Sequence, residues 1–251
     1  MFQILGIRIY IFPVIIILAT YICIWIFLHS TKYDHFYYIW IKKSAAYVMT
    51  GAISCGKLLY AATRILEGNY GILNVLNGFI FYGGFLGVIL GLYIFSRKEN
   101  IRFSDITDVY ASFFPLGQAI GRIGCYFNGC CYGKEYTGFG AVNYVVDGIE
   151  TTVFPTWFVE SMFCILLFLC FFRISKRMYS GMYFAYYMMS YGIFRFIIEN
   201  YRGDMIRGVW YGISTSQYIS IMVVIGGVWY AFYSVRLKRK NLMIIGRDRI
   251  G

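Results

Sequence analysis

Charged residues are scarce in this sequence. They make up 14% of the 251 residues, whereas a soluble globular domain carries about a quarter. Hydrophobic residues reach 59%, and the mean hydropathy is +0.62. A cytosolic enzyme, a disordered chain and a secreted disulfide scaffold do not fit these values. Proline is also rare, with three residues, which argues against a proline-rich linker between domains. The class that remains is a polytopic membrane protein.

Seven segments are apolar over the length that crosses a bilayer, about 20 residues in a helix. The sequence therefore predicts an all-α polytopic membrane protein with about seven transmembrane helices, built as a single integral membrane domain over residues 1–251. The first segment lacks a small-residue cleavage site, so we expect it to be a mature span and not a signal peptide. The predicted spans are residues 10–29, 44–63, 77–96, 106–127, 155–172, 181–199 and 214–235.

The basic residues predict an orientation. Fifteen of the 23 Lys and Arg residues fall in the odd-numbered connections and the C-terminal tail, and five fall in the N-terminus and the even-numbered loops. Cytoplasmic loops collect Lys and Arg, so the N-terminus is expected outside and residues 236–251 form a basic cytoplasmic tail. The tail either contacts anionic membrane lipids or serves only as a stop-transfer anchor. This distribution accounts for the net charge of +11 without nucleic acid.

The longest outer connection covers residues 128–154 and is polar, aromatic and rich in glycine. Its length makes it a candidate functional or re-entrant segment. Non-helical backbone at membrane depth is tolerated only where protein buries it or water reaches it.

A few charged residues lie within or at the ends of the predicted spans. Each costs about 2.5–3.5 kcal/mol at the bilayer centre, so each is a functional candidate by default. Arg122, Glu160, Arg195, Glu199 and Arg202 all come near the outer side in the predicted topology. One interpretation is a structural Arg–Glu network that holds helices together. A site for an anionic ligand is favoured, because guanidinium groups suit a phosphate, and phosphate at a membrane surface usually belongs to a lipid headgroup.

Several motifs resemble one known family, the prolipoprotein diacylglyceryl transferases. The central motif matches a family signature that reads roughly G-x-x-x-G-R-x-G-N-F-x-N-G-E, and Asp108 and Pro115 precede it at the family's spacing. Other elements follow the family in order, and the resemblance covers roughly residues 50–225. The motifs are SCGKLLY at 54–60, FYGGFLG at 81–87, GQAIGRIGCYFNG at 117–129, PTWFVES at 155–161, YGIFRFIIENYR at 191–202 and STSQYIS at 214–220.

The resemblance implies a reaction, its partners and its site residues. Such enzymes move the diacylglyceryl group of phosphatidylglycerol onto the lipobox cysteine thiol of prolipoproteins, whose signal peptides they must contact, and glycerol phosphate leaves. They are multi-pass proteins of the bacterial plasma (inner) membrane, and no cofactor or metal is expected. The catalytic candidates are Arg122, Arg195, Glu199 and Tyr82. The candidates for substrate binding are Arg122, Asn128, Gly83, Gly84, Glu160 and Arg202.

The sequence departs from the family pattern at three positions. Tyr82 replaces the histidine of H-G-G, Cys125 replaces the first signature asparagine, and Cys130 replaces the acid after N-G. The two histidines of the chain, His29 and His35, are predicted at the cytoplasmic end of the first span and its loop. A histidine base is therefore absent from the outer side. Tyr82 is expected to orient the phosphate or glycerol, while Glu199 or the phosphate itself takes the thiol proton.

Three of the seven cysteines, Cys125, Cys130 and Cys131, lie close together beside Arg122. Tight packing is the simplest interpretation, and a disulfide on the oxidising side or a catalytic thiol are alternatives. A metal site is disfavoured, because no further ligand or histidine follows at a recognisable spacing. The remaining cysteines lie in predicted spans as small buried hydrophobes.

Two other functions stay open at this point. The chain could be a divergent homologue that transfers a lipid group to another acceptor. It could also be a lipid-binding membrane protein without catalysis. A transporter would commonly show inverted repeats, which are not evident in the sequence.

Overall fold

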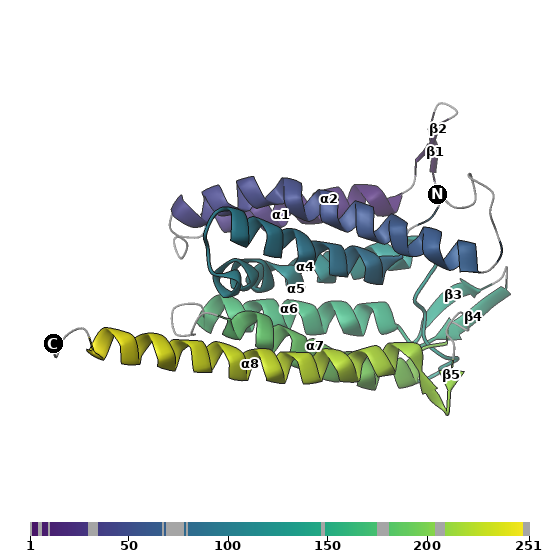
Figure 1. The fold of residues 1–251 in the computed structure, drawn as a ribbon. Coiled ribbons are helices and arrows are strands. Elements are labelled where there is room, and N and C mark those ends of the chain that lie inside the picture. Colours follow the sequence, from purple (N-terminus) through teal and green to yellow (C-terminus); the bar gives the residue numbers. More distant parts are fainter. Residues whose placement is uncertain are drawn as a thin grey trace. The chain divides into compact units, whose positions relative to one another are not determined.

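The computed structural model is mostly helical, and each predicted span corresponds to one helix (Figure 1). It describes residues 2–4, 7–9, 11–29, 35–66, 68, 78, 80–146, 149–174, 181–203 and 209–247. The 3-10 helix η1, Glu199–Tyr201, follows α7 directly. The α-helices in the described residues are α1 Ile11–His29, α2 His35–Leu66, α4 Phe81–Lys98, α5 Phe103–Phe127, α6 Thr156–Ile174, α7 Met182–Ile198 and α8 Thr215–Arg247.

Two helices are much longer than the spans predicted for them. α2 has 32 residues, and α8 has 33 and extends through most of the predicted basic tail. At about 1.5 Å per residue, each is close to 50 Å long, which exceeds the thickness of a bilayer core. An apolar run predicts only the part of a helix that lipid or protein surrounds. The helix extends further into water where its residues have sufficient helix propensity.

Three short antiparallel hairpins accompany the helices, and the sequence did not predict them. They pair β1 Phe2–Ile4 with β2 Ile7–Ile9, β3 Val142–Val146 with β4 Ile149–Val153, and β5 Val209–Trp210 with β6 Ile213–Ser214. The β3–β4 hairpin occupies the predicted outer loop, with Val142 opposite Val153 and Val146 opposite Ile149. The loop is therefore an ordered element that borders the end of α5 and the start of α6.

The chain divides into two compact units. One consists of Met1–Ser30 and Tyr110–Gly251, and the other of Thr31–Val109. In the second unit, glycines bring α4 against α2. A Cβ at Gly87 would lie 2.0 Å from the Gly51 carbonyl oxygen, and one at Gly91 would lie 2.3 Å from the Tyr47 carbonyl oxygen. Only glycine permits such close backbone contact. The glycine-rich element at the start of α4 is thus explained in part by helix packing.

The first unit has a core where α5, α6 and α7 meet. Ala111, Phe171, Tyr183 and Tyr187 form a buried cluster. Buried hydrogen bonds fix the register of the helices: Ser161 Oγ donates to the Ala119 carbonyl at 3.0 Å, and Tyr187 Oη donates to Gln118 Oε1 at 2.7 Å. Buried polar groups that are paired this way align helices more specifically than apolar contacts do.

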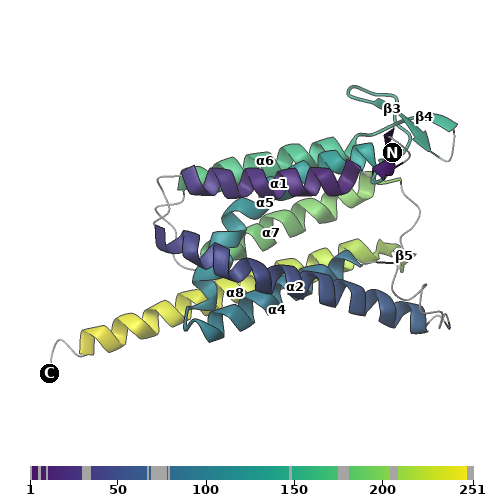
Figure 2. The same cartoon turned by 90° about the horizontal axis from the view of Figure 1, so that it is seen from above.

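Within this unit, α8 runs alongside α7 and then continues toward the C-terminus (Figures 1 and 2). The β3–β4 and β5–β6 hairpins lie at one end of these helices, where α5 and α7 finish and α6 and α8 begin. Side chains from the ends of four helices therefore come together there. In the described residues, two helices are long and apolar enough to cross a membrane, namely α6 and the Thr215–Arg236 part of α8.

Candidate functional site

Glu160 is the centre of a buried charge network in the first unit. It lies one turn into α6, and its side chain is 1% exposed. Arg122 of α5 places Nη2 2.8 Å from Glu160 Oε1, and Tyr191 of α7 donates its hydroxyl to the same oxygen at 2.6 Å. Arg122 Nη2 also donates to Tyr191 Oη at 3.3 Å. Three helices thus converge on one buried carboxylate, which compensates the charge of the partly buried Arg122.

Arg195 extends this network along α7. Its Nη2 lies 2.8 Å from Glu199 Oε2, a pair spaced four residues apart as helix geometry favours. Its Nη1 lies 4.0 Å from Glu160 Oε2 and makes no hydrogen bond to any residue that the structure describes. Arg195 is 9% exposed. A buried guanidinium nitrogen without a hydrogen-bond partner is unusual, and its N–H can donate to a ligand oxygen at little cost.

The start of α8 holds Glu199 in place through a capping box. Ser214 precedes the helix, and its Oγ accepts the Gln217 backbone N–H at 3.2 Å, while Gln217 Oε1 accepts the Ser214 N–H at 3.0 Å. Ser214 Oγ also donates to Glu199 Oε1 at 3.0 Å. Gln217 Nε2 reaches Asn200 Oδ1 at 3.2 Å. Both oxygens of Glu199 are therefore engaged, and the cap joins the end of α7 to the beginning of α8.

Three thiols lie beside Arg122. The sulfurs of Cys125, Cys130 and Cys131 lie within 4.8 Å of one another. Arg122 Nη1 is 3.7 Å from Cys131 Sγ, and Asn128 Nδ2 is 3.9 Å from Cys130 Sγ. Hydrogen bonds from the Cys125 and Cys130 thiols lower the pKa of Cys131, and the charges of Arg202 and Arg122 act in the same direction. Cys131 is thus the thiol that is most readily ionised.

Backbone and side-chain hydrogen bonds fix the loop that carries Cys130 and Cys131 to the end of α5, which carries Cys125. Cys130 N–H donates to the Cys125 carbonyl at 3.1 Å, and Cys131 adopts a left-handed conformation with φ 63°. Thr156 Oγ1 at the start of α6 donates to the Cys131 carbonyl at 2.6 Å. Local hydrogen bonds such as these compensate for the cost of positive φ in a residue with a side chain.

Hydrogen bonds at two glycines hold the segment after Cys131 next to the end of β4 and to the residues that follow α7. Gly133 N–H donates to the Phe154 carbonyl at 3.0 Å, and Gly203 N–H donates to the Tyr132 carbonyl at 3.2 Å. A Cβ at Gly133 would lie 2.3 Å from the Phe154 carbonyl oxygen. Gly133 also forms a β-bridge with Arg202, whose side chain is buried. These contacts therefore hold Arg202 close to the thiols and to the loop.

The structure brings together four of the residues that the sequence singled out: Arg122, Glu160, Arg195 and Glu199. Asn128 is exposed and contacts a thiol. In the other unit, Tyr82 is 40% exposed, and Gly83 packs its backbone against α2, where a Cβ would lie 2.6 Å from the Cys55 carbonyl oxygen. Substrate contact for Asn128, Tyr82, Gly83, Gly84 and Arg202 stays a prediction.

Sequence reasoning missed Tyr191, Ser214 and Gln217. Two signals were available. Tyr191 precedes Arg195 by four residues and so shares its helix face. Ser214 and Gln217 have the S-x-x-Q spacing of a capping box. Neither signal predicts the partner across the fold, which is Glu160 for Tyr191 and Glu199 for Ser214.

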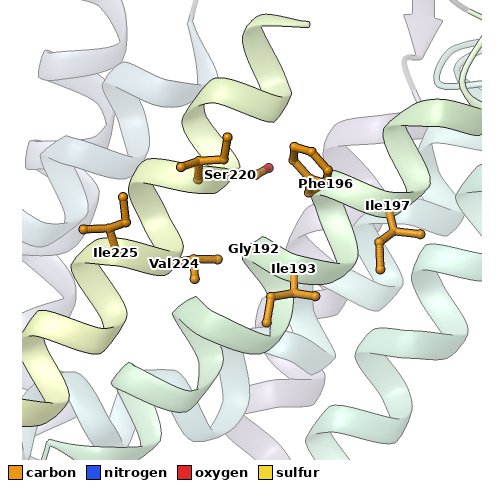
Figure 3. A pocket seen from close by; sticks show the side chains of 8 residues that line it. Gly192, Ile193, Phe196, Ile197, Ser220, Val224 and Ile225 are labelled. Atoms are coloured by element: carbon orange, nitrogen blue, oxygen red, sulfur yellow. The ribbon is translucent and has the colours of Figure 1, made fainter. Parts of the chain in front are cut away.

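A pocket opens between α7 and α8 next to this network (Figure 3). Its volume is about 270 Å³, and its lining is almost wholly apolar. Ser220 forms the polar edge of the pocket. One turn before it on α8, Ser216 accepts a 3.5 Å hydrogen bond from Arg195 Nη2, which connects the pocket to the charge network. The lining residues are Gly192, Ile193, Phe196, Ile197, Ser220, Ile221, Val224 and Ile225. An apolar chain could lie there while a polar group attached to it approaches Arg195.

Known proteins resemble this chain over almost its whole length. The sequence model of the family described as "Prolipoprotein diacylglyceryl transferase" matches residues 1–233. A phosphatidylglycerol–prolipoprotein diacylglyceryl transferase of Clostridium tetani is 32% identical over 236 residues, which cover 91% of this chain and 94% of that protein. A protein of the same name numbered 2, from Clostridium perfringens, is 33% identical over 72% of this chain and 73% of its own length.

A third relative with this name comes from Dehalococcoides mccartyi and is 29% identical over 86% of this chain and 85% of its own length. The family match covers the predicted spans almost to the end of the seventh and includes every residue of the charge network. From these matches, the chain belongs to the prolipoprotein diacylglyceryl transferase family.

Proposed function

We propose that this protein transfers the diacylglyceryl group of phosphatidylglycerol to the lipobox cysteine thiol of prolipoproteins. The sulfur of the acceptor attacks the glycerol carbon that carries the phosphate ester. A C–S bond forms, the C–O bond to phosphate breaks, and glycerol phosphate leaves as an anion. The names of the relatives support this reaction, since each names phosphatidylglycerol and prolipoprotein.

The observation that carries the proposal is the buried network of Arg122, Glu160, Arg195 and Glu199. In it, Arg122 pairs with Glu160 and Arg195 pairs with Glu199, and the buried Arg202 lies nearby. Arg195 Nη1 has no hydrogen-bond partner in the described part of the chain. A departing phosphate offers acceptor oxygens to this nitrogen, and in a site of low dielectric such bonds stabilise the negative charge that develops.

In this proposal, Glu160 and Glu199 position the arginines. Glu199 accepts a bond at each oxygen, one from Arg195 and one from Ser214. Glu160 accepts from Arg122 and Tyr191 at Oε1, and its Oε2 lies 4.0 Å from Arg195 Nη1. The departing phosphate then becomes the better acceptor for the thiol proton, with Glu199 as the alternative. Tyr82, Gly83, Gly84 and Asn128 contact the headgroup or the peptide. The pocket between α7 and α8 holds one acyl chain of the donor lipid.

The protein acts as a multi-pass enzyme of the bacterial plasma membrane, with seven spans and its N-terminus outside. The distribution of Lys and Arg supports this orientation. The two helices that are apolar enough to span support a lipid surrounding, because only 28% of the window in α6 and 17% of the window in α8 are buried by protein. Trp229 and Phe232 on α8 are more than 60% exposed, a cost in water that lipid removes.

Arg195→Lys tests the proposal in a purified assay with phosphatidylglycerol and a lipobox peptide. Lysine keeps the charge but loses the planar pair of donors, one for Glu199 and one for the phosphate. We expect transfer to fall by about 100-fold or more, as for loss of one donor to a transition-state anion. Arg173→Lys, at the far end of α6, is the matched control and should transfer normally.

Full activity in Arg195→Lys would contradict the phosphate role. If the wild-type protein binds the lipid but never modifies the peptide, the transfer proposal fails, and the divergent homologue with another acceptor takes its place. Retention of the variant in the membrane must be measured alongside, since loss of protein would indicate a structural role for the pair.

A further inference from the structure

The three thiols beside Arg122 are arranged as metal ligands are. The sulfurs of Cys125, Cys130 and Cys131 lie within 4.8 Å of one another, and none is in a disulfide. A tetrahedral zinc ion with Zn–S bonds of about 2.3 Å holds its sulfurs about 3.8 Å apart. The thiols therefore reach ligand geometry by small side-chain rotations. The backbone that carries them is already fixed by the Thr156 and Cys125 hydrogen bonds.

Packing alone does not require this convergence. Cys164 of α6 is buried as a single small hydrophobe. The thiols of Cys125 in α5 and of Cys130 and Cys131 in the loop after it point at one another, and the two in the loop are only partly buried. A disulfide accounts for two of them and leaves the third unpaired. Two of the three, Cys125 and Cys130, also stand where the family signature has asparagine and an acid.

The charges around the cluster suit a metal–thiolate centre. Three thiolates and one Zn²⁺ carry a net charge of −1. Arg122 Nη1 lies 3.7 Å from Cys131 Sγ, and the charge of Arg202 also acts on Cys131. Positive charge at this distance stabilises both thiolate ligands and an anionic centre. The same Arg122 binds Glu160 through Nη2, so the cluster is one side chain away from the charge network.

We propose that Cys125, Cys130 and Cys131 bind one Zn²⁺ ion and leave its fourth coordination position open for the acceptor cysteine. Zinc sites with three protein ligands and an open position are typical of catalysis, and closed four-ligand sites are structural. A thiol that coordinates zinc loses its proton and remains a nucleophile. The inference rests on the proposed transfer reaction and explains how this chain activates a thiol without the family histidine.

The bond changes stay those of the proposed reaction. The acceptor thiol gives up its proton on coordination, its sulfur forms the new bond to the glycerol carbon, and the carbon–oxygen bond to phosphate breaks. The departing glycerol phosphate takes up the proton. No oxidant or reductant is needed.

Metal content tests the site without any transfer assay. The full-length chain is purified in detergent under reducing conditions with Zn²⁺ present, freed of excess ion, and analysed by mass spectrometry for zinc and for free thiols. We expect about one zinc per chain in the wild type, and a decrease of at least about tenfold in Cys125→Ser, Cys130→Ser and Cys131→Ser. Cys170→Ser, an exposed cysteine of α6 outside the cluster, is the matched control and should retain zinc.

Cobalt tests the open position. Co²⁺ bound by the three thiolates should show thiolate-to-metal charge-transfer absorption, which a lipobox peptide should change and the same peptide with serine in place of cysteine should not. An identical response to both peptides would overturn the role in thiol activation. Wild-type protein with free thiols and no zinc would overturn the site, as would a disulfide that forms in place of metal binding.

These outcomes also separate the inference from the proposed function. Transfer by a zinc-free wild-type protein would refute the metal site and leave the transferase intact. Zinc binding without transfer to any lipobox peptide would refute the transferase assignment, while the metal content would still establish the site.

Discussion

Glu160→Gln should destabilise the protein and lower its activity, because Glu160 is the carboxylate on which the charge network is centred. Glutamine has nearly the same shape as glutamate, so the change removes a charge and not volume. In the wild type, one carboxylate accepts Arg122 at 2.8 Å and Tyr191 at 2.6 Å, and it lies 4.0 Å from Arg195. Without it, the guanidinium groups of Arg122 and Arg195 lie close together, and among the described residues only Glu199 remains in an ion pair with either of them. The amide also offers an N–H where the site needs acceptors.

The magnitude follows from burial. Glu160 is 1% exposed, so water does not screen the lost interaction. Removing one partner of a buried pair costs about 3–5 kcal/mol, because the remaining charge stays buried. For a chain of this length, each kcal/mol lowers the Tm by about 2–4 °C, so the expected decrease is about 6–20 °C. Transfer should fall with it, since Arg122 and Arg195 lose their positions.

Thermal unfolding of the purified protein in detergent, with intrinsic tryptophan fluorescence as the signal, measures the effect. Glu150→Gln, an exposed carboxylate on β4, is the matched control and should leave the Tm unchanged. A second variant that combines Glu160→Gln with Arg122→Gln should recover part of the loss, because fewer charges then stay unpaired. If Glu160→Gln unfolds at the wild-type temperature and transfers normally, the network is not what holds the arginines.

Three further predictions concern other parts of the chain. Tyr82→Phe should slow transfer about 10–100-fold if its hydroxyl makes one charge-assisted bond, and Tyr82→His should retain or raise activity in the same peptide assay. Gly133→Ala should lower the Tm and the activity, because its Cβ would lie 2.3 Å from the Phe154 carbonyl oxygen. Gly117→Ala is the control and should be tolerated, because the atom nearest to its Cβ is 3.6 Å away. A single cysteine at Lys176 in a cysteine-free background should react with an impermeant thiol reagent only after lysis, and labelling in intact cells would refute the orientation.

The sequence by itself determined which segments are helices. Residues 10–29 were predicted and α1 covers Ile11–His29, and residues 155–172 were predicted and α6 covers Thr156–Ile174. This agreement has a local cause, since a long apolar run satisfies its backbone only as a helix when no water is near. The sequence also determined the family and the charged residues, because charge within an apolar run is rare and each occurrence is informative.

Only the tertiary structure decided how those charges are paired. Arg122 and Tyr191 are 69 residues apart and meet on Glu160, which also lies 4.0 Å from Arg195. The substrate contact that the sequence predicted for Glu160 stays a prediction. The hairpin β3–β4 and the cap between Ser214 and Gln217 were also absent from the sequence prediction, whereas the proximity of the three thiols to Arg122 was part of it. Helix formation depends on neighbours within one turn, whereas these contacts depend on which helix ends the packing of α5, α6, α7 and α8 brings together.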